Sequence, residues 1–310
     1  MTPVMPRGSR EGHGSLCSDD RVIAIVIVTF SGDAAMLDAC VASVRSAGGA
    51  DHIIVVDNGG RALVDSAAGS GVELIRPARN LGFGGGANTG FRRAAELGAS
   101  YVALLNDDIE VDPGWLQPLV AALDSDGRLG AAQPKLLRAD SDPARVNSVG
   151  VVIGSDGAGS DIGFDELDGP AFVSDRAIDS FTGGAVLFAA AFLDETRGFD
   201  ESYFLYYEDV DLARRGTERG WMYRCVPQSV VWHRVSASTT QLGDRARYFQ
   251  ERNRLRFVLR FGDRATIGRA FWLSARRLRW TPRWVHAKAL AAGLVSAPSV
   301  LLARRAGRKR

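Results

Sequence analysis

Cysteine is scarce in this 310-residue sequence, and this scarcity limits the kinds of site that the chain can build. The three cysteines, Cys17, Cys40 and Cys225, are odd in number and widely spaced. Neither a disulfide framework nor a zinc site has the spacing that it needs. A reducing, cytoplasmic compartment is therefore expected.

Long hydrophobic runs are also missing. The first twenty residues hold Pro, Gly, Ser and charges without the apolar core of a secretory signal, so we expect residues 1–20 to be a disordered tail. The apolar stretch at 289–303 is interrupted by Ser296, Pro298 and Ser299, and it falls short of the ~20 residues that a membrane-spanning helix needs. Peripheral attachment to a membrane is favoured over insertion.

Charge is distributed unevenly along the chain. Residues 244–310 contain 18 Arg and Lys against three acids, whereas residues 1–243 contain 20 bases against 33 acids. Phe271, Trp272, Trp280 and Trp284 interleave with the arginines, a mixture suited to an anionic membrane surface on the inner face of the cell membrane. A solvated helical face is the plainer alternative. No nucleic acid is expected as a partner, because the bases form no recognised reading motif.

The hydrophobic pattern predicts an α/β fold. Short runs rich in β-branched residues alternate with stretches of helical periodicity, which indicates a mostly parallel sheet with helices on both faces. Residues 138–180 are rich in Gly, Asp and Ser, which predicts a loop-rich excursion or short antiparallel strands. The predicted strands are 22–28, 53–56, 74–75 and 101–105, and the predicted helices are 36–47, 87–97 and 245–261, with further helix broken near Pro282 and Pro298.

Polar residues follow several of these strands, at the edge of a parallel sheet where ligands collect. Thr29 ends the first strand and Asp57 the second. The fourth is followed by Asn106, Asp107 and Asp108, whose carboxylates suit a hard divalent ion, Mg²⁺ or Mn²⁺. Helix capping by these acids, and an ordinary Asp-Asn turn at Asp57, are the structural alternatives.

Two further segments carry candidate chemistry. Residues 79–90 place a glycine-rich loop before a helix, where backbone amides can approach phosphates. At 203–211, aromatic residues lead into Glu208, Asp209 and Asp211, so Asp209 is a candidate general base beside an aromatic sugar platform; favourable charge at a helix start is the alternative. His233 follows an apolar run, where a lone histidine is more often a packing residue than a ligand.

Seven motifs in this order resemble the rhamnosyltransferase-like branch of glycosyltransferase family 2. They are Val-Thr-Phe at 28–30, Val-Val-Asp-Asn at 55–58, Asn-Leu-Gly-Phe-Gly-Gly-Gly-Ala-Asn at 80–88, Asn-Asp-Asp at 106–108, Gly-Phe-Asp-Glu at 198–201, Tyr-Glu-Asp-Val-Asp-Leu at 207–212 and Trp-His at 232–233. The resemblance spans residues 22–260 and includes a helix at 247–254.

The resemblance implies a GT-A fold, a Rossmann-like α/β domain, with inverting transfer. It implies a catalytic domain at 21–243, with a nucleotide-binding half at 21–137 and an acceptor half at 138–243, followed by a basic helical C-terminal extension at 244–310. Asp209 would be the base, and Asp108 and His233 would hold the ion. Donor contacts would come from Thr29, Phe30, Asp57, Arg79, Asn80, Gly82, Asn106 and Asp107, and acceptor contacts from Gly183, Gly184, Tyr207 and Glu208. Asn106 departs from the pattern, since it replaces an acid.

The expected function is transfer of rhamnose, galactofuranose or a hexose from a dTDP- or UDP-sugar, with Mn²⁺ or Mg²⁺. The acceptor would be a hydroxyl of a cell-envelope glycan or lipid-linked glycan. A catalytically silent nucleotide-sugar or glycan-binding module of the same fold is the alternative, and Asn106 is the feature that supports it.

Overall fold

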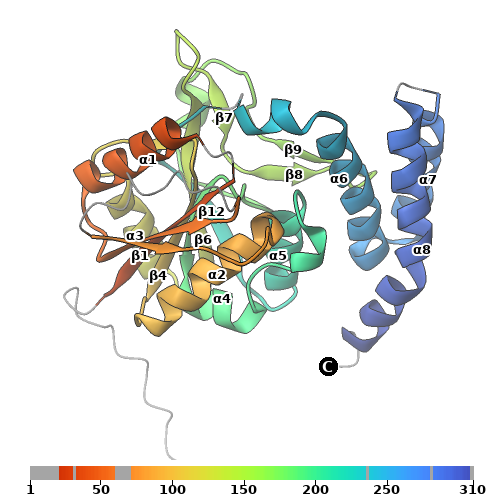
Figure 1. Cartoon of the computed structure of the whole chain (residues 1–310), viewed down its shortest axis with the longest axis horizontal. Helices are drawn as coiled ribbons and strands as arrows, with labels where there is room; N and C mark the ends of the chain where they lie inside the picture. Colours follow the sequence, from red (N-terminus) through yellow and green to blue (C-terminus); the bar gives the residue numbers. More distant parts are fainter. Residues whose placement is uncertain (1–20, 31–32, 60–70, 235–236, 280–281, 308–310) are drawn as a thin grey trace, which may run out of the picture.

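The computed structural model describes residues 21–30, 33–59, 71–234, 237–279 and 282–307; the predicted tail at 1–20 lies outside them. A large sheet runs through the centre, with helices on both faces, and the last three helices stand beside this body (Figure 1). The strands are β1 (Ile23–Thr29), β2 (His52–Asp57), β3 (Val72–Ile75), β4 (Tyr101–Asn106), β5 (Ile109–Val111), β6 (Leu129–Arg138), β7 (Val146–Ser148), β8 (Val151–Ile153), β9 (Gly159–Asp161), β10 (Arg176–Ala177), β11 (Ala185–Ala189) and β12 (Met222–His233). The helices are α1 (Ala34–Ala47), α2 (Gly82–Glu96), α3 (Leu116–Ser125), α4 (Ala190–Thr196), α5 (Glu208–Thr217), α6 (Ala237–Phe261), α7 (Arg264–Arg277) and α8 (Arg283–Gly307).

The main path of the sheet has the order β10-β12-β6-β11-β4-β1-β2-β3. Strands β3, β2, β1 and β4 are parallel neighbours, and β6 and β12 are also parallel to each other. Because β11 is antiparallel to both β4 and β6, these six strands share one direction. The mostly parallel α/β fold predicted from the sequence is confirmed.

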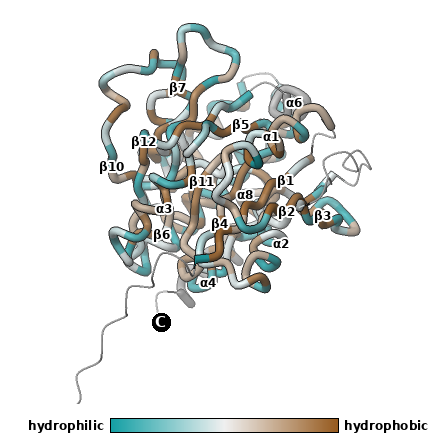
Figure 2. Tube along the Cα trace, turned by 90° about the vertical axis from the view of Figure 1, so that its left-hand side faces the viewer, coloured by the Kyte–Doolittle hydropathy of each residue, from teal (hydrophilic) through white to brown (hydrophobic). Residues whose placement is uncertain are grey.

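Each face of the sheet is covered by its own set of helices, and strand β1 shows how the sequence specifies both. Ala24, Val26 and Val28 point into a core shared with α2, α4 and α5. Ile25 and Ile27 point into the opposite core, shared with α1 and α3. A run of β-branched residues is therefore buried on both faces, and Figure 2 shows this hydrophobic character along β1, β2 and β4.

The glycine-rich segment forms the first turns of α2, which corrects the predicted loop. Its glycines allow close packing: a Cβ on Gly90 would lie 2.2 Å from Val26 Cγ1, and one on Gly86 would lie 3.1 Å from Val28 Cγ1. The start of the helix is also occupied, because the amide of Phe83 donates to the carbonyl of Phe204. Tertiary packing thus outweighs the low helix propensity of glycine here.

The stretch at 138–180 contains short antiparallel pairs, as the sequence indicates. Strand β7 pairs with β6, β10 pairs with β12, and β8 and β9 form a separate two-stranded sheet. In Figure 1 the β8–β9 hairpin reaches toward α6. Arg254 of α6 meets it, donating to the carbonyl of Asp156 over 2.8 Å.

The C-terminal helices pack onto the sheet domain through a third apolar cluster. Val210 of α5 and Val151 of β8 share this cluster with Leu255 and Val258 of α6 and Ala270 of α7. Helix α6 kinks at Gly243, where φ is +45° and the helical dihedrals are interrupted. The division between residues 243 and 244 stays a prediction.

One predicted helix break is wrong. The chain does break between α7 and α8 near Pro282, but Pro298 lies inside α8, which continues to Gly307. A proline removes one backbone hydrogen bond and bends a helix, and the apolar residues on both sides continue the helix here. Among the described residues, none of the helices is both long enough and apolar enough to cross a bilayer.

Candidate functional site

The carboxyl ends of the parallel strands bring the predicted polar residues to one edge of the sheet. A cavity of about 780 Å³ opens there, within the range typical of small-molecule sites. Of the residues predicted from sequence, the ones in its wall are Asn106, Asp108, Gly183, Gly184, Tyr207, Glu208, Asp209 and His233. Segments as far apart as the end of β4 and the start of α5 therefore share one space.

Asp108 and His233 are brought together by strand pairing. Strand β5 pairs antiparallel with β12, with Ile109 opposite His233, and the amide of Arg234 donates to the carbonyl of Asp108 over 3.0 Å. As a result, His233 Nε2 lies 3.2 Å from Asp108 Oδ1. Asn147 Oδ1 lies 2.7 Å from His233 Nδ1; because this oxygen only accepts, Nδ1 carries the proton.

In the neutral imidazole with its proton on Nδ1, the unprotonated Nε2 faces the carboxylate oxygen of Asp108. Asp108 Oδ1 is buried and has no hydrogen-bond partner among the described residues. Two facing lone pairs repel each other unless a cation lies between them, and neutral imidazole and carboxylate are both ligands for divalent ions. The pair therefore fits a metal ion. No group of three or more His, Cys, Asp or Glu side chains converges in this way in the described part of the chain, so protein ligands are few.

Asn106 and Asp107 lie beside this pair. Thr29 Oγ1 donates to Asp107 Oδ2 over 2.6 Å, which joins the ends of β1 and β4. The amide of Asn106 donates to the carbonyl of Gly184 over 2.9 Å, and its side-chain Oδ1 is buried without a hydrogen-bond partner among the described residues. Asn106 thus provides a neutral acceptor next to Asp107 and Asp108, at the position where the family motif has an acid.

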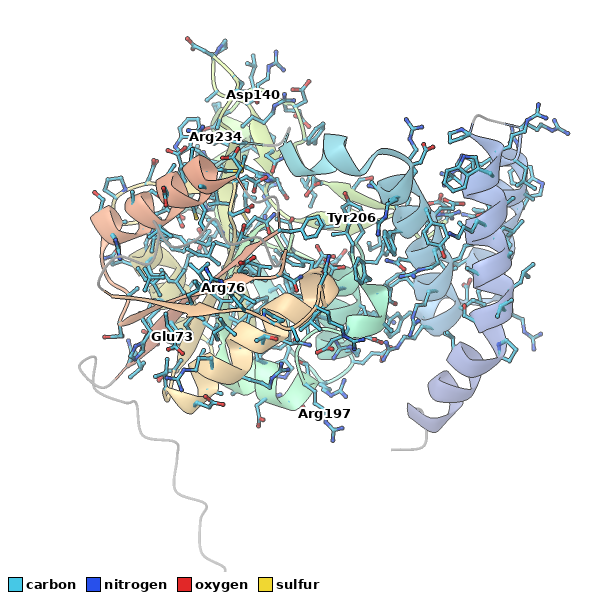
Figure 3. All side chains as sticks on the ribbon, viewed as in Figure 1. Glu73, Arg76, Asp140, Arg197, Tyr206 and Arg234 are labelled. Atoms are coloured by element: carbon cyan, nitrogen blue, oxygen red, sulfur yellow. The ribbon has the colours of Figure 1, made fainter. Side chains whose placement is uncertain are left out.

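The donor-side residues continue along the same edge. Asp57 is buried at the end of β2, with Oδ2 3.5 Å from Nε of Arg76, which Figure 3 labels. Asn58 donates to Asn80 Oδ1 over 3.2 Å, and this oxygen also accepts from the amide of Gly82 over 2.8 Å. Asn80 and Gly82 are therefore tied to the turn after Asp57.

The remaining two donor-side predictions lie at the surface. Phe30 is 45% exposed at the end of β1, and Arg79 is exposed after β3. Neither residue lines the cavity. Their contact with a donor stays a prediction.

Asp209 lies in the first turn of α5, where backbone amides hold its carboxylate. Oδ2 accepts from Gly183 N over 3.0 Å, and Oδ1 accepts from Val210 N over 2.8 Å. Burial raises the pKa of Asp209 to about 6; these amides oppose the rise, and the charge of Asp161 adds to it. Burial and the charge of Asp209 raise the pKa of Glu208 well above its usual range. A carboxylate with a raised pKa is a stronger base near neutral pH.

The loop before α5 has an unusual backbone. Phe204, Tyr206 and Tyr207 all have positive φ, at 67°, 65° and 73°, a conformation that non-glycine residues adopt only when their surroundings enforce it. Asn253 of α6 provides that enforcement: its buried Nδ2 lies 3.0, 2.7 and 2.7 Å from the carbonyl oxygens of Tyr203, Leu205 and Tyr206. The first turn of α5, with Asp209, follows directly.

Only part of the predicted aromatic platform faces the cavity. Tyr206, labelled in Figure 3, and Tyr207 line the cavity. Tyr203 is fully buried, and Phe204 stacks on Phe249 of α6 with ring centroids 5.2 Å apart. The two inward rings pack the loop against the core and against α6.

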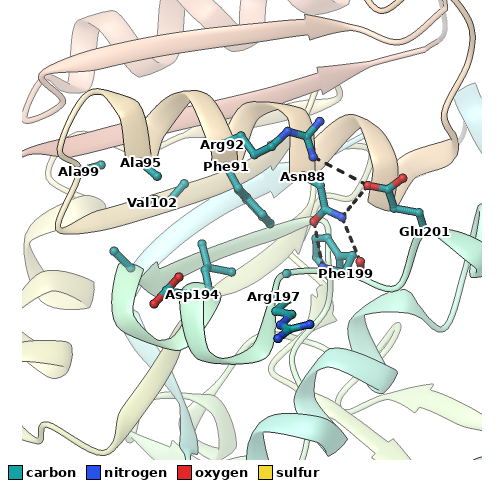
Figure 4. A pocket seen from close by; sticks show the side chains of 13 residues that line it. Asn88, Phe91, Arg92, Ala95, Ala99, Val102, Asp194, Arg197, Phe199 and Glu201 are labelled. Atoms are coloured by element: carbon teal, nitrogen blue, oxygen red, sulfur yellow. Dashed lines mark hydrogen bonds and ion pairs between the residues drawn. The ribbon is translucent and has the colours of Figure 1, made fainter. Parts of the chain in front are cut away.

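A second cavity, of about 580 Å³, lies between α2 and α4 (Figure 4). Its polar centre is Asn88, which accepts from the amide of Phe199 over 2.9 Å and donates to Glu201 Oε1 over 3.0 Å. Phe91, Val102 and other apolar side chains form the rest of its wall. The side chain of Asn88 is already hydrogen-bonded to Phe199 and Glu201. We therefore interpret this cavity as a gap in the packing between α2 and α4.

Three site residues escaped the sequence analysis. Asn147 orients His233, Asp161 raises the pKa of Asp209, and Asn253 holds the loop before α5. The first two lie in the irregular stretch at 138–180, and Asn253 lies in a helix that reads as a basic surface. No sequence motif marks these three residues, because each one acts on a residue at least 47 positions away along the chain. Asn147 and Asp161 also lie in a stretch without helical or strand periodicity.

Comparison with known proteins agrees with this geometry. Residues 24–145 match the family model described as glycosyl transferase family 2. The N-acetylglucosaminyl-diphospho-decaprenol L-rhamnosyltransferase of Mycobacterium tuberculosis is 26% identical over 259 residues, covering 74% of this chain and 79% of that protein.

Two solved structures share the fold. GalNAc-T7 with UDP, GalNAc and Mn²⁺ superposes with a TM-score of 0.62 at 14% identity, covering 88% of this chain and 55% of that one. The mannosyltransferase PcManGT from Pyrobaculum calidifontis, in complex with GDP-Man and Mn²⁺, gives a TM-score of 0.53 at 16% identity, covering 93% and 81%. These two likenesses show the fold alone.

The architecture is that of the GT-A glycosyltransferases, and the matched family and relative are glycosyltransferases. The family model over residues 24–145 and the relative named as an L-rhamnosyltransferase support the assignment that the motifs predict, glycosyltransferase family 2 of the rhamnosyltransferase-like kind.

Replacing Asn253 by Ala tests whether α6 holds the loop before α5. Three loop carbonyls each lose the hydrogen bond from Asn253, so we expect the free energy of unfolding to fall by about 3 kcal/mol and backbone amides at 203–209 to exchange hydrogen faster. Urea unfolding and hydrogen exchange measure these effects. Gln250→Ala, at an exposed position of the same helix, is the control; equal behaviour of the two variants would contradict the assignment.

Proposed function

We propose that this chain is an inverting, divalent-metal-dependent transferase. It moves rhamnose, galactofuranose or a hexose from a dTDP- or UDP-sugar to a hydroxyl of a lipid-linked or cell-envelope glycan. The observation that carries the proposal is the cavity that Asp108, His233 and Asp209 share. The Mn²⁺ in both structural neighbours and the lipid-diphosphate substrate in the relative's name support it.

The donor nucleotide would lie along the ends of β2, β1 and β4. Asp57 would accept a hydrogen bond from the base, and Asp107 would face the ribose. The other donor contacts would come from Thr29, Phe30, Arg79, Asn80, Gly82 and Asn106. This path would lead the diphosphate toward Asp108 and His233, which both line the cavity.

Asp108 and His233 would hold Mn²⁺ or Mg²⁺. When bound, the ion would neutralise the negative charge that develops on the leaving diphosphate. Because Asn106 is neutral and only two protein ligands converge, we expect the ion to bind weakly until the donor diphosphate adds its own oxygens. Asn147 keeps the proton of His233 on Nδ1 and so leaves Nε2 for the ion.

Asp209 would act as the base in a single displacement. Its carboxylate accepts the proton of the acceptor hydroxyl while that oxygen bonds to the anomeric carbon and the bond to the diphosphate breaks on the opposite face. The anomeric configuration inverts, and Asp209 then releases the proton to water. Gly183 and Val210 amides hold the carboxylate, and with Gly184, Tyr207 and Glu208 they shape the acceptor side.

The pH dependence of transfer tests this role. Since only the ionised carboxylate accepts a proton, the rate should be constant above about pH 6 and fall about tenfold per unit below it. A normal aspartate would lose activity only at lower pH. The substrates are dTDP-rhamnose, UDP-galactofuranose and UDP-hexoses with Mn²⁺, and Asp209→Asn should lower the rate by ~10²–10⁴ at every pH.

Asp161→Asn is the matched control for this experiment. It removes the charge that raises the pKa of Asp209, so transfer should persist while its midpoint moves to lower pH. An Asp209→Asn enzyme as fast as the wild type would refute the proposed base and would favour a binding module of the same fold.

We also propose that the C-terminal helices rest on the anionic inner face of the cell membrane. Trp272 and Trp284 are 56% and 55% exposed, and Leu294 and Val295 are 58% and 82% exposed. The guanidinium of Arg276 lies 4.7 Å from the ring centre of Trp272. Exposed indoles among arginines suit the headgroup region, and a lipid-linked acceptor is reached from there.

Vesicle flotation measures this contact. The full chain should float with phosphatidylglycerol vesicles, and Trp272→Ala with Trp284→Ala should weaken partitioning about thirtyfold, since each half-exposed indole adds ~1 kcal/mol. Met222→Ala, which removes an exposed apolar side chain from the catalytic domain, should change nothing. Flotation of the double variant at the wild-type level would eliminate the proposed surface.

A further inference from the structure

The cavity that holds Asp209 has two walls of opposite charge. The catalytic domain contributes the acids Asp108, Asp161, Glu208 and Asp209. Every Arg or Lys among the described lining residues comes from the C-terminal helices: Arg247 and Arg254 of α6 and Arg277 of α7. His286 of α8 joins them, and Glu251 is the single acid on this basic wall.

One member of the basic wall is structural. Arg254 is 3% exposed and donates to Glu251, Ser274 and the carbonyl of Asp156, which ties α6 to α7 and to the β8–β9 hairpin. Arg277 also contacts Glu251, through Nη1. These bonds neutralise Glu251 and leave a surplus of positive charge on the wall.

Arg247 and His286 have side-chain groups that a ligand could contact. The side chain of Arg247 is 61% exposed, and its ion pair with Asp244 is long, at 3.6 Å. His286 Nδ1 is buried and has no hydrogen-bond partner among the described residues. A buried ring nitrogen without a partner costs free energy, which a bound acceptor or donor group would recover.

We propose that Arg247, Arg277 and His286 form a binding site for the phosphate groups of the acceptor. The inference rests on the proposed function in its lipid-linked form, with the diphosphate link that the relative's substrate name contains. Arginine and imidazole side chains that face one space are the usual recognition groups for phosphate oxygens.

The electrostatics of the cavity separate this group from the donor diphosphate. The donor group needs a metal ion, because Asp108 and its acidic neighbours repel an anion. A second diphosphate finds compensating charge only at the helical wall. An acceptor hydroxyl at Asp209 with its phosphates at Arg247 would therefore span the cavity from the acidic wall to the basic wall.

The lipid end of the acceptor has a direct route to the bilayer. Trp284 lies two positions before His286 on α8, so the two side chains point to nearly opposite sides of the helix. His286 lines the cavity, whereas Trp284 is exposed. The same helix thus contacts the acceptor on one side and the proposed membrane surface on the other.

Binding of geranyl diphosphate to the full-length protein in EDTA tests the site without transfer. Calorimetry should show that Arg247→Gln combined with His286→Gln weakens binding roughly tenfold or more. Asp108→Asn should bind the probe at least as well as the wild type, because it removes a repelling charge. Arg245→Gln, at an exposed position on the same helix outside the cavity, is the charge-matched control.

Transfer assays then separate this inference from the proposed function. The paired variant should raise KM roughly tenfold for a sugar carried on prenyl diphosphate and leave KM unchanged for the same sugar on an octyl group and for the donor. Undiminished probe binding, or equal rises for both acceptors, would overturn the phosphate site. Absence of transfer to either acceptor, with probe binding still lost in the variant, would refute only the proposed function.

The same variants distinguish an acceptor phosphate from a membrane headgroup. Flotation of the paired variant with phosphatidylglycerol vesicles should match the wild type. Reduced flotation with unchanged probe binding would show that these side chains contact the bilayer, and it would overturn the inference.

Discussion

The amide of Asn253 is the contact on which the geometry of the site most depends. It lies at the centre of α6 and donates to the carbonyl groups of Tyr203, Leu205 and Tyr206, in a loop with three left-handed non-glycine residues. Arg260, about two turns further along α6, contacts Asp211 of α5 over 2.7 Å. The catalytic domain therefore gains the position of its acidic helix from the helix that follows it, and the two cannot be regarded as independent parts.

This dependence explains how one cavity holds groups of opposite charge. The sheet edge places Asp108 and His233 by strand pairing, and α5 adds Asp209 beside them. Burial raises the pKa values of Glu208 and Asp209, and the charges of neighbouring carboxylates add to the rise. Buried carboxylates with raised pKa values are typical of binding and catalytic sites. In the proposed function, a bound metal ion would offset their negative charge.

The sequence predicts the buried strands well and the packing-dependent features poorly. Residues 53–56 lie wholly within β2 because a buried parallel strand needs a contiguous apolar run. The predictions for the start of α2 and for a helix break at Pro298 were wrong, because glycine and proline have low intrinsic helix propensity. Packing of α2 against strand β1, and apolar residues on both sides of Pro298 in α8, outweigh that propensity. The motifs identified Asp108, Asp209 and His233, which line one cavity in the structure. Asn147 and Asn253 could not be identified from the sequence, because their hydrogen-bond partners are brought near them only by the fold.

We propose that one divalent ion and one sugar carbon lie between Asp108, His233 and Asp209. A crystal structure with Mn²⁺ and a non-hydrolysable dTDP- or UDP-sugar tests it most directly, through the anomalous scattering of manganese. We expect a manganese peak within ~2.0–2.3 Å of Asp108 Oδ1 and His233 Nε2, with the carboxylate of Asp209 on the far side of the anomeric carbon from the diphosphate. A peak bound elsewhere, with His233 and Asp108 still facing each other directly, would contradict it.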